Sequence, residues 1–299
     1  MRYAILFLFI FQALDIYSQN YREDFYKLSE TDDQNAQSAL LKTWEKDQPN
    51  NPELLIAYFN FYIYKSKKEQ IRLSADQPSS ESLKPSSQDT SGKPDAFMYS
   101  ETYYDPKTMD TAFQYLDKGI KLNPDRLDMR FGKIYMLENM QQYEIFTNEI
   151  VKAIDRSSLN NNIWLWTDNK PLDQPKDFML SSIQDYIFQI YDTEDDDLLP
   201  YMKQISEAIL KYYPDHIASL SNISIVHMIF KEYDKALENL LKAEKLKADD
   251  TVVLSNIAYA YRMKEDMVNA IKYYELVVKY GDPDSKKYAT EQIDSIKQN

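Results

Sequence analysis

The sequence predicts an all-α protein, built as a solenoid of stacked helical hairpins. Residues 220–224 (Leu-Ser-Asn-Ile-Ser) recur 34 positions later as residues 254–258 (Leu-Ser-Asn-Ile-Ala), and a fixed period of this length marks a repeat architecture. Each unit holds two apolar stripes at helical spacing, separated by a short polar turn such as 231–232. The 299 residues include only 4 glycines, which suits long helices joined by short turns.

Segment 217–284 resembles two tandem tetratricopeptide repeats (TPRs), of the kind found in exported bacterial proteins. The residues of the first unit that match the family pattern are Leu220, Ile223, Ser224, Tyr233, Ala236 and Ala243. Those of the second unit are Leu254, Ile257, Ala258, Ala270 and Val277, with Met267 in place of the aromatic residue. Small side chains let two helices cross closely, and a larger one would cost roughly 1–3 kcal/mol of overpacking. The resemblance implies a TPR-like α-solenoid.

Composition restricts the classes of partner and chemistry. The apolar fraction of 43% is ordinary for a folded protein, and the net charge is −13. Nucleic acids and anionic membrane surfaces both require a basic face, so we expect neither as a partner. There is no cysteine, which excludes disulfides, Cys-ligated zinc and a lipid-anchored N-terminal cysteine.

The N-terminal residues 1–18 are typical of a secretory signal peptide. Arg2 precedes an apolar run from Tyr3 to Phe11, and Ser18 is small enough for a cleavage site. The run is short for a membrane span, so we expect no integral span in the mature chain. The alternatives are an uncleaved anchor and a buried helix. A cleaved signal predicts a periplasmic or secreted protein.

Residues 19–299 are expected to form the solenoid. A helix is predicted over 32–47, and another begins at Pro52, where Asn51 is a suitable N-cap. Residues 74–96 are rich in Ser and Pro and poor in apolar residues, so we interpret them as a flexible insertion in a TPR turn. The second helix of that repeat is expected to begin at 105–106.

The C-terminal two thirds continue the pattern. Residues 127–156 resemble a divergent repeat, and 157–175 are a connector rich in Ser, Asn and Pro. Helices are predicted at about 176–192 and 198–213, followed by the clear repeats of 217–284. The mostly polar residues 285–299 suit a capping helix that covers the last hairpin.

The TPR resemblance implies a concave groove lined by the first helix of each unit. Carried over by repeat position, the partner-binding residues are Phe131, Tyr135, Glu138, Ile187, Tyr191, Ser221, Ile225, Met228, Ser255, Tyr259 and Arg262. Three of these are tyrosines at equivalent positions, and tyrosine offers a rigid apolar body with a hydrogen-bonding tip. We therefore expect a non-catalytic scaffold that binds a peptide or partner protein. Packing by the insertion or the connector is the alternative role for some of these residues.

Other candidate sites give weaker signals. Trp164 and Trp166 suggest an alternative function, a stacking platform in a carbohydrate- or solute-binding protein. The acidic run Asp192–Asp197 could bind calcium, but it lacks EF-hand spacing, so we favour an acidic helix start. His216 and His227 are not at metal-ligand spacing. No motif indicates a cofactor, a metal site or an enzyme, and the oligomeric state stays open.

Overall fold

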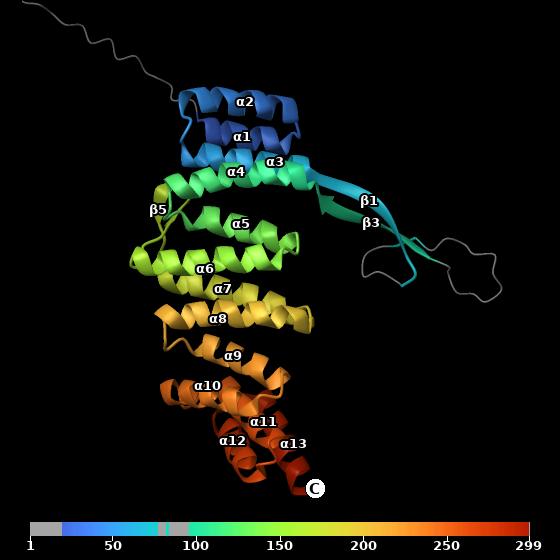
Figure 1. Cartoon of the computed structure of the whole chain (residues 1–299), viewed down its shortest axis with the longest axis vertical. Helices are drawn as coiled ribbons and strands as arrows, with labels where there is room; N and C mark the ends of the chain where they lie inside the picture. The colour runs from blue at the N-terminus through green and yellow to red at the C-terminus, as the bar shows by residue number, and fades with distance from the viewer. Residues whose placement is uncertain (1–19, 77–81, 84–95, 299) are drawn as a thin grey trace, which may run out of the picture.

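The structure is a computed structural model that describes residues 20–76, 82–83 and 96–298 (Figure 1). The predicted signal peptide and most of the predicted 74–96 insertion lie outside these residues.

The described α-helices follow one another along a single stack (Figure 1). They pair as six antiparallel hairpins, α1 with α2 through α11 with α12, and α13 closes the C-terminal end. Their bounds are α1 Tyr21–Glu30, α2 Gln34–Asp47, α3 Pro52–Ser66, α4 Pro106–Leu122, α5 Leu127–Asn139, α6 Tyr143–Leu159, α7 Pro175–Asp192, α8 Leu199–Tyr212, α9 Ile217–Ile229, α10 Tyr233–Leu246, α11 Thr251–Met263, α12 Met267–Tyr280 and α13 Pro283–Gln298. This arrangement confirms the predicted solenoid of helical hairpins. Helix α1 was not predicted from the sequence.

Three hairpins close with the same turn between their two helices. A non-glycine residue takes positive φ in each turn: Gln141 (55°), Lys231 (60°) and Glu265 (61°). The next amide donates to a carbonyl five residues back: Gln142 to Leu137 (2.9 Å), Glu232 to His227 (2.8 Å) and Asp266 to Tyr261 (3.0 Å). This 6→1 bond with a left-handed residue is the Schellman ending of a helix. It turns the chain sharply enough for the second helix to pack against the first.

Small residues stand where the two helices of the C-terminal hairpins cross. Ala236, Ala258 and Ala270 are fully buried. The buried Ser224 hydroxyl lies 2.8 Å from the Leu220 carbonyl and 3.1 Å from the Ala236 carbonyl, and so links α9 to α10. The predicted close crossing is therefore present, and it leaves no room for a larger side chain.

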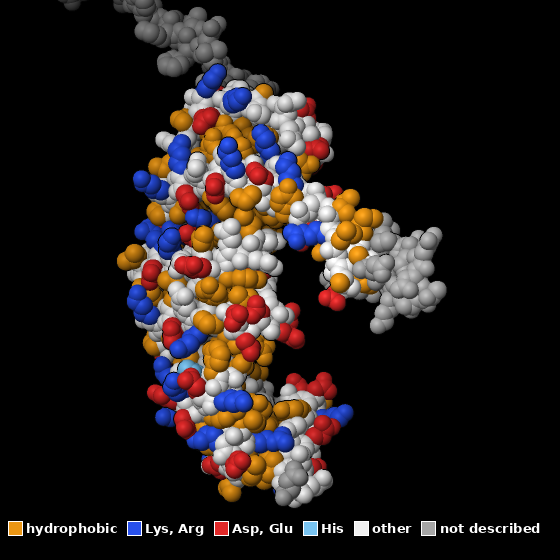
Figure 2. Space-filling view, turned by 45° about the vertical axis from the view of Figure 1, so that its right-hand side comes forward, with side chains coloured by type: hydrophobic (Ala, Val, Ile, Leu, Met, Phe, Trp, Pro, Cys, Tyr) orange, Lys and Arg blue, Asp and Glu red, His pale blue; other side chains and the backbone are white. Residues whose placement is uncertain are grey.

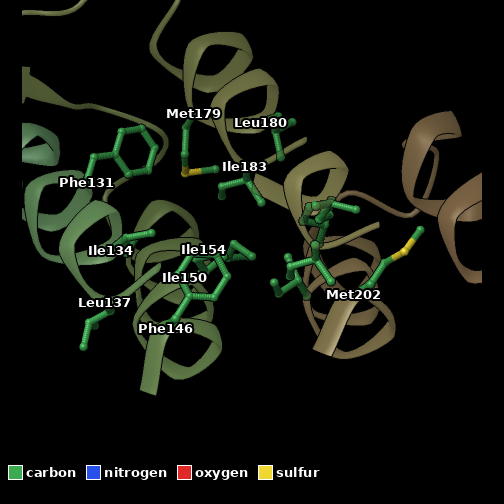
Figure 3. Packing of buried hydrophobic residues seen from close by; sticks show 14 of the residues in the cluster. Phe131, Ile134, Leu137, Phe146, Ile150, Ile154, Met179, Leu180, Ile183 and Met202 are labelled. Carbon is green, nitrogen blue, oxygen red and sulfur yellow. The ribbon is translucent and has the colours of Figure 1, made fainter. Parts of the chain in front are cut away.

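The central hairpins α5–α6 and α7–α8 are packed with large side chains instead. Figure 3 shows Phe131 and Ile134 of α5, Ile150 of α6 and Ile183 of α7 gathered in one shared cluster. Phe146 stands where the family pattern has a small residue, and close backbone approaches are fewer here than between α9 and α10. These two hairpins are therefore divergent repeats with a wider crossing.

The segment between α6 and α7 holds the first half of the stack to the second. It contains β4 (Leu165–Trp166), η1 (Thr167–Asn169) and β5 (Lys170–Pro171). Arg126, whose side chain is 0% exposed, lies beneath it. Its guanidinium pairs with Glu53 of α3 at 2.7 Å and with Asp128 of α5 at 2.7 Å, and it donates to Asn169 at 3.2 Å. One buried cation thus joins three parts of the chain.

Two long antiparallel strands of a β-ribbon flank the predicted insertion 74–96. Strand β1 (Lys67–Ser74) pairs antiparallel with β3 (Phe97–Tyr104), from Lys67 opposite Tyr104 to Ser74 opposite Phe97, and β2 (Ser82–Leu83) pairs with the other edge of β3. The Asp105 amide donates to the Ser66 carbonyl at 2.8 Å and closes the base of the ribbon. Figure 1 shows the ribbon projecting from the stack, so the strands take no part in the helical core. The all-α prediction holds for the stack and missed this ribbon.

Replacement of Ala236 by leucine is expected to lower the free energy of unfolding by about 1–3 kcal/mol, because the side chain would overpack the crossing of α9 and α10. Urea unfolding followed by circular dichroism measures the change. Leucine at the exposed Ala39 of α2 is the control and should shift it by less than about 0.5 kcal/mol. Equal effects at both positions would contradict the close crossing.

Replacement of Arg126 by methionine should lower the free energy of unfolding by roughly 3–5 kcal/mol, because Glu53 and Asp128 would stay largely buried without a cation. The matched control is Lys203→Met, which breaks the exposed pair with Glu207 and should cost less than about 1 kcal/mol. Urea unfolding of both variants measures the two changes in the free energy of unfolding. A loss at Arg126 as small as the control's would show that the buried cation does not hold the two halves together.

Candidate functional site

The residues expected to line the groove differ in how far they reach solvent. The three tyrosines at equivalent repeat positions are exposed: Tyr135 (55%), Tyr191 (44%) and Tyr259 (40%). Glu138, Ile225, Met228, Ser255 and Arg262 are half-buried. The exposed tyrosine rings are therefore the groove residues most available to a partner.

Phe131, Ile187 and Ser221 are buried and act as core residues rather than contact residues. Phe131 packs against Phe178 and Tyr186 of α7 at ring-centroid distances of 6.3 and 6.2 Å. Phe131, Ile187 and Ser221 share one repeat position, so that position belongs to the core in α5, α7 and α9 rather than to the groove.

Phe188 is a surface residue that sequence reasoning missed, with 61% of its side chain exposed. The buried stripe of α7 runs through Met179, Ile183, Ile187 and Ile190. That spacing of three or four residues leaves Phe188 off the stripe, so the hydrophobic pattern contained the signal.

Arg262 is held within the molecule. Its guanidinium donates to the Gln292 side chain of the capping helix α13. At the C-terminal end of the predicted groove, Arg262 therefore binds the capping helix α13.

We call the residues on the turn side of the central hairpins the central wall. Its residues are Tyr135, Glu138, Tyr143, Tyr191, Asp192, Asp195 and Ile229. Tyr143 of α6 stacks on Tyr201 of α8 with ring centroids 6.5 Å apart. Tyr191, Asp192, Asp195 and Ile229 line a shallow pocket of about 240 Å³. Figure 2 shows a hollow on this side of the molecule, with acidic side chains on its wall at mid-height.

The charged residues of the central wall, Glu138, Asp192 and Asp195, are all acidic. Burial raises the pKa of Glu138. Burial, followed by the charges of Glu138 and Asp195, raises the pKa of Tyr143. Burial, followed by the charge of Glu138, raises the pKa of Tyr186 to about 12. The charge of Glu138 thus contributes to the shifts of both tyrosines, and the charge of Asp195 to that of Tyr143.

The two tryptophans of the connector have different surroundings. Trp164 is 1% exposed, and its indole nitrogen donates to the Ser157 hydroxyl at 3.1 Å. Trp166 is half-buried and meets Phe178 edge-on at 5.4 Å. The structure therefore does not provide the exposed two-tryptophan platform that the sequence suggested.

Both histidines have structural contacts. His216 caps α9, because its Nδ1 accepts the Ser219 amide at 3.3 Å, and burial lowers its pKa. His227 is buried, and its Nδ1 lies 2.6 Å from a carboxylate oxygen of Glu232.

Asp195, in the acidic run, caps the short η2 helix (Asp196–Leu198) by accepting the Asp197 amide at 3.0 Å. Within the ranges described above, no three His, Asp or Glu side chains are grouped to hold a metal ion. A membrane-spanning helix would need a longer apolar stretch than any described helix provides.

Comparisons with known proteins found matches only among solved structures. No family model matches the chain, and no curated protein matches it. Among solved structures, YrrB, described as a TPR protein with an unusual peptide-binding site, is 12% identical, with 84% of this chain and 97% of that chain covered and a TM-score of 0.39. PilW, a type IV pilus biogenesis factor, is 10% identical over 86% and 90%, with a TM-score of 0.35. Yeast Tom70 is 14% identical over 92% of this chain and 59% of that chain, with a TM-score of 0.34. At these identities and TM-scores the similarities carry no information about a ligand or a function.

Proposed function

We propose that this protein is a non-catalytic interaction scaffold that binds an extended peptide or a segment of a partner protein along its inner side, centred on the central wall. The observation that supports this most is the row of exposed aromatic side chains on first helices of the hairpins, Tyr135, Tyr191 and Tyr259. Exposed aromatic rings are costly to leave in water and are common anchors of protein interfaces.

The polar groups of the central wall suit binding better than catalysis. It presents tyrosines and carboxylates, and the chain's two histidines are engaged elsewhere as a helix cap and a buried pair. General acid–base or nucleophilic catalysis needs a base within hydrogen-bond reach of a reacting group. The proposal therefore assigns no reaction to this surface. With Trp164 buried, no observation favours the carbohydrate-binding alternative.

The groove is tested by affinity capture from the native envelope fraction, with partners quantified by mass spectrometry. The double variant Tyr135→Ala/Tyr191→Ala should reduce recovery of at least one partner by tenfold or more, since two interface anchors together contribute about 2 kcal/mol or more. Tyr280→Ala, which removes an equally exposed ring at the end of α12, is the control and should leave recovery unchanged. Unaltered recovery of every partner by the double variant, with helicity intact, would contradict the groove.

A periplasmic or secreted location is the second half of the proposal, and the apolar residues 3–11 after Arg2 support it. Mass spectrometry of the N-terminus of the native protein is expected to find a chain that begins near Gln19 in the envelope or extracellular fraction. An N-terminus at Met1 together with recovery in the cytosol would contradict this location.

A further inference from the structure

Glu138 is a half-buried carboxylate with no cationic partner in the described part of the chain. From Asp125 to the end of α8, every other acidic side chain that is at least half-buried is paired: Asp125 with Arg156, Asp128 with Arg126, Glu149 with Lys133 and Lys152, and Asp155 with Lys211. No ion pair or hydrogen bond joins the Glu138 carboxylate to another described residue. Burial of an unpaired carboxylate destabilises a protein, so its presence calls for an explanation outside the folded chain.

The surroundings of Glu138 are those of a site for a cation. It lies one turn after Tyr135 on α5 and is close enough to Tyr143 and Tyr186 to raise their pKa values. Ring faces attract Lys and Arg side chains, and a carboxylate beside them adds a charged hydrogen-bond acceptor. An unpaired carboxylate one helical turn from an exposed tyrosine ring therefore favours a cationic side chain over an anionic or purely apolar one.

Helix ends make the same region more negative. Glu138 is in the last turn of α5, and Asp192 is the last residue of α7. The C-terminal end of a helix carries partial negative charge, which favours a cation and disfavours a carboxylate. The isolated protein thus keeps an unfavourable arrangement at both positions, and a bound cation would relieve it.

The surrounding sequence supplies no cation of its own. Between Lys133 and Lys152, and again between Lys176 and Lys203, there is no Lys or Arg, while the same two stretches hold ten Asp and Glu residues: Glu138, Glu144, Glu149, Asp177, Asp185, Asp192, Glu194, Asp195, Asp196 and Asp197. A second copy of a chain with net charge −13 would be repelled. A basic partner segment is complementary to this surface.

We propose that the segment bound at the central wall is basic, and that one of its Lys or Arg side chains pairs with Glu138 between Tyr135, Tyr143 and Tyr186. This inference rests on the proposed function and specifies the chemistry of the partner. The exposed acids of the turn between α7 and α8, Asp192 and Asp195 among them, attract the remaining positive charge of the segment and speed its association.

A displayed library of random 12-residue peptides, selected on the full chain, tests the charge of the partner. The selected peptides should be enriched at least twofold in Lys and Arg over the unselected library. A selected basic peptide should bind about tenfold more weakly to Glu138→Gln, since the substitution keeps the side chain's shape and removes its charge. Glu238→Gln, an equal change of charge at an exposed position on α10, should change the affinity less than twofold.

The possible outcomes distinguish failure of the basic-partner proposal from failure of the proposed peptide-binding groove. Selection of peptides without basic enrichment, whose binding is lost on Tyr135→Ala, would overturn the basic partner and leave the groove in place. Equal binding of a basic peptide to Glu138→Gln and Glu238→Gln, with both variants folded by circular dichroism, would overturn the role of Glu138. Selection of no peptide above the level on empty support would overturn both proposals.

Discussion

The covering of each hairpin's apolar face by its neighbour is the constraint on which this structure depends. Leu220 of α9, Leu254 of α11 and Tyr274 of α12 belong to one buried cluster, so no C-terminal hairpin has a complete core alone. The last exposed face is covered by Ala289 and Ile293 of α13. Because stability comes from contacts along the stack, side chains that point away from the stacking direction contribute little to it. Tyr135 and Tyr191 are such residues, and they can serve a partner without weakening the core.

At the junction between α4 and α5, ion pairs as well as apolar contacts hold one hairpin against the next. Arg126 is fully buried there with Glu53, Asp128 and Asn169, and Asp168 of the connector pairs in turn with Arg22 of α1 at 2.6 Å. A buried ion pair is specific because its partners must meet with correct geometry. The connector, which reads as a loop by composition, thereby fixes the first two hairpins relative to the central wall.

Much of the fold was predictable because it repeats, and the exceptions have physical causes. Residues 217–284 contain two units in register, so the small residues at the crossings and the polar turns could be read directly. The β-ribbon was missed because β1 and β3 are stabilised by pairing across a long separation in the chain, which a local pattern does not show. Ile187 was chosen for a repeat position that is also buried at Phe131 and Ser221, whereas Phe188, one residue further along α7, is exposed. Glu138 was named from its repeat position alone, since its burial and its lack of a cationic partner are properties of the folded structure.

Hydrogen–deuterium exchange of the full chain, with and without a saturating basic 12-residue peptide, tests the central claim most directly. The central wall as a binding surface predicts slower amide exchange on peptide addition at the C-terminal ends of α5 and α7 and in the turn before α8, with α10 and α12 unchanged. Protection confined to the β-ribbon, or spread evenly over all the helices, would contradict it.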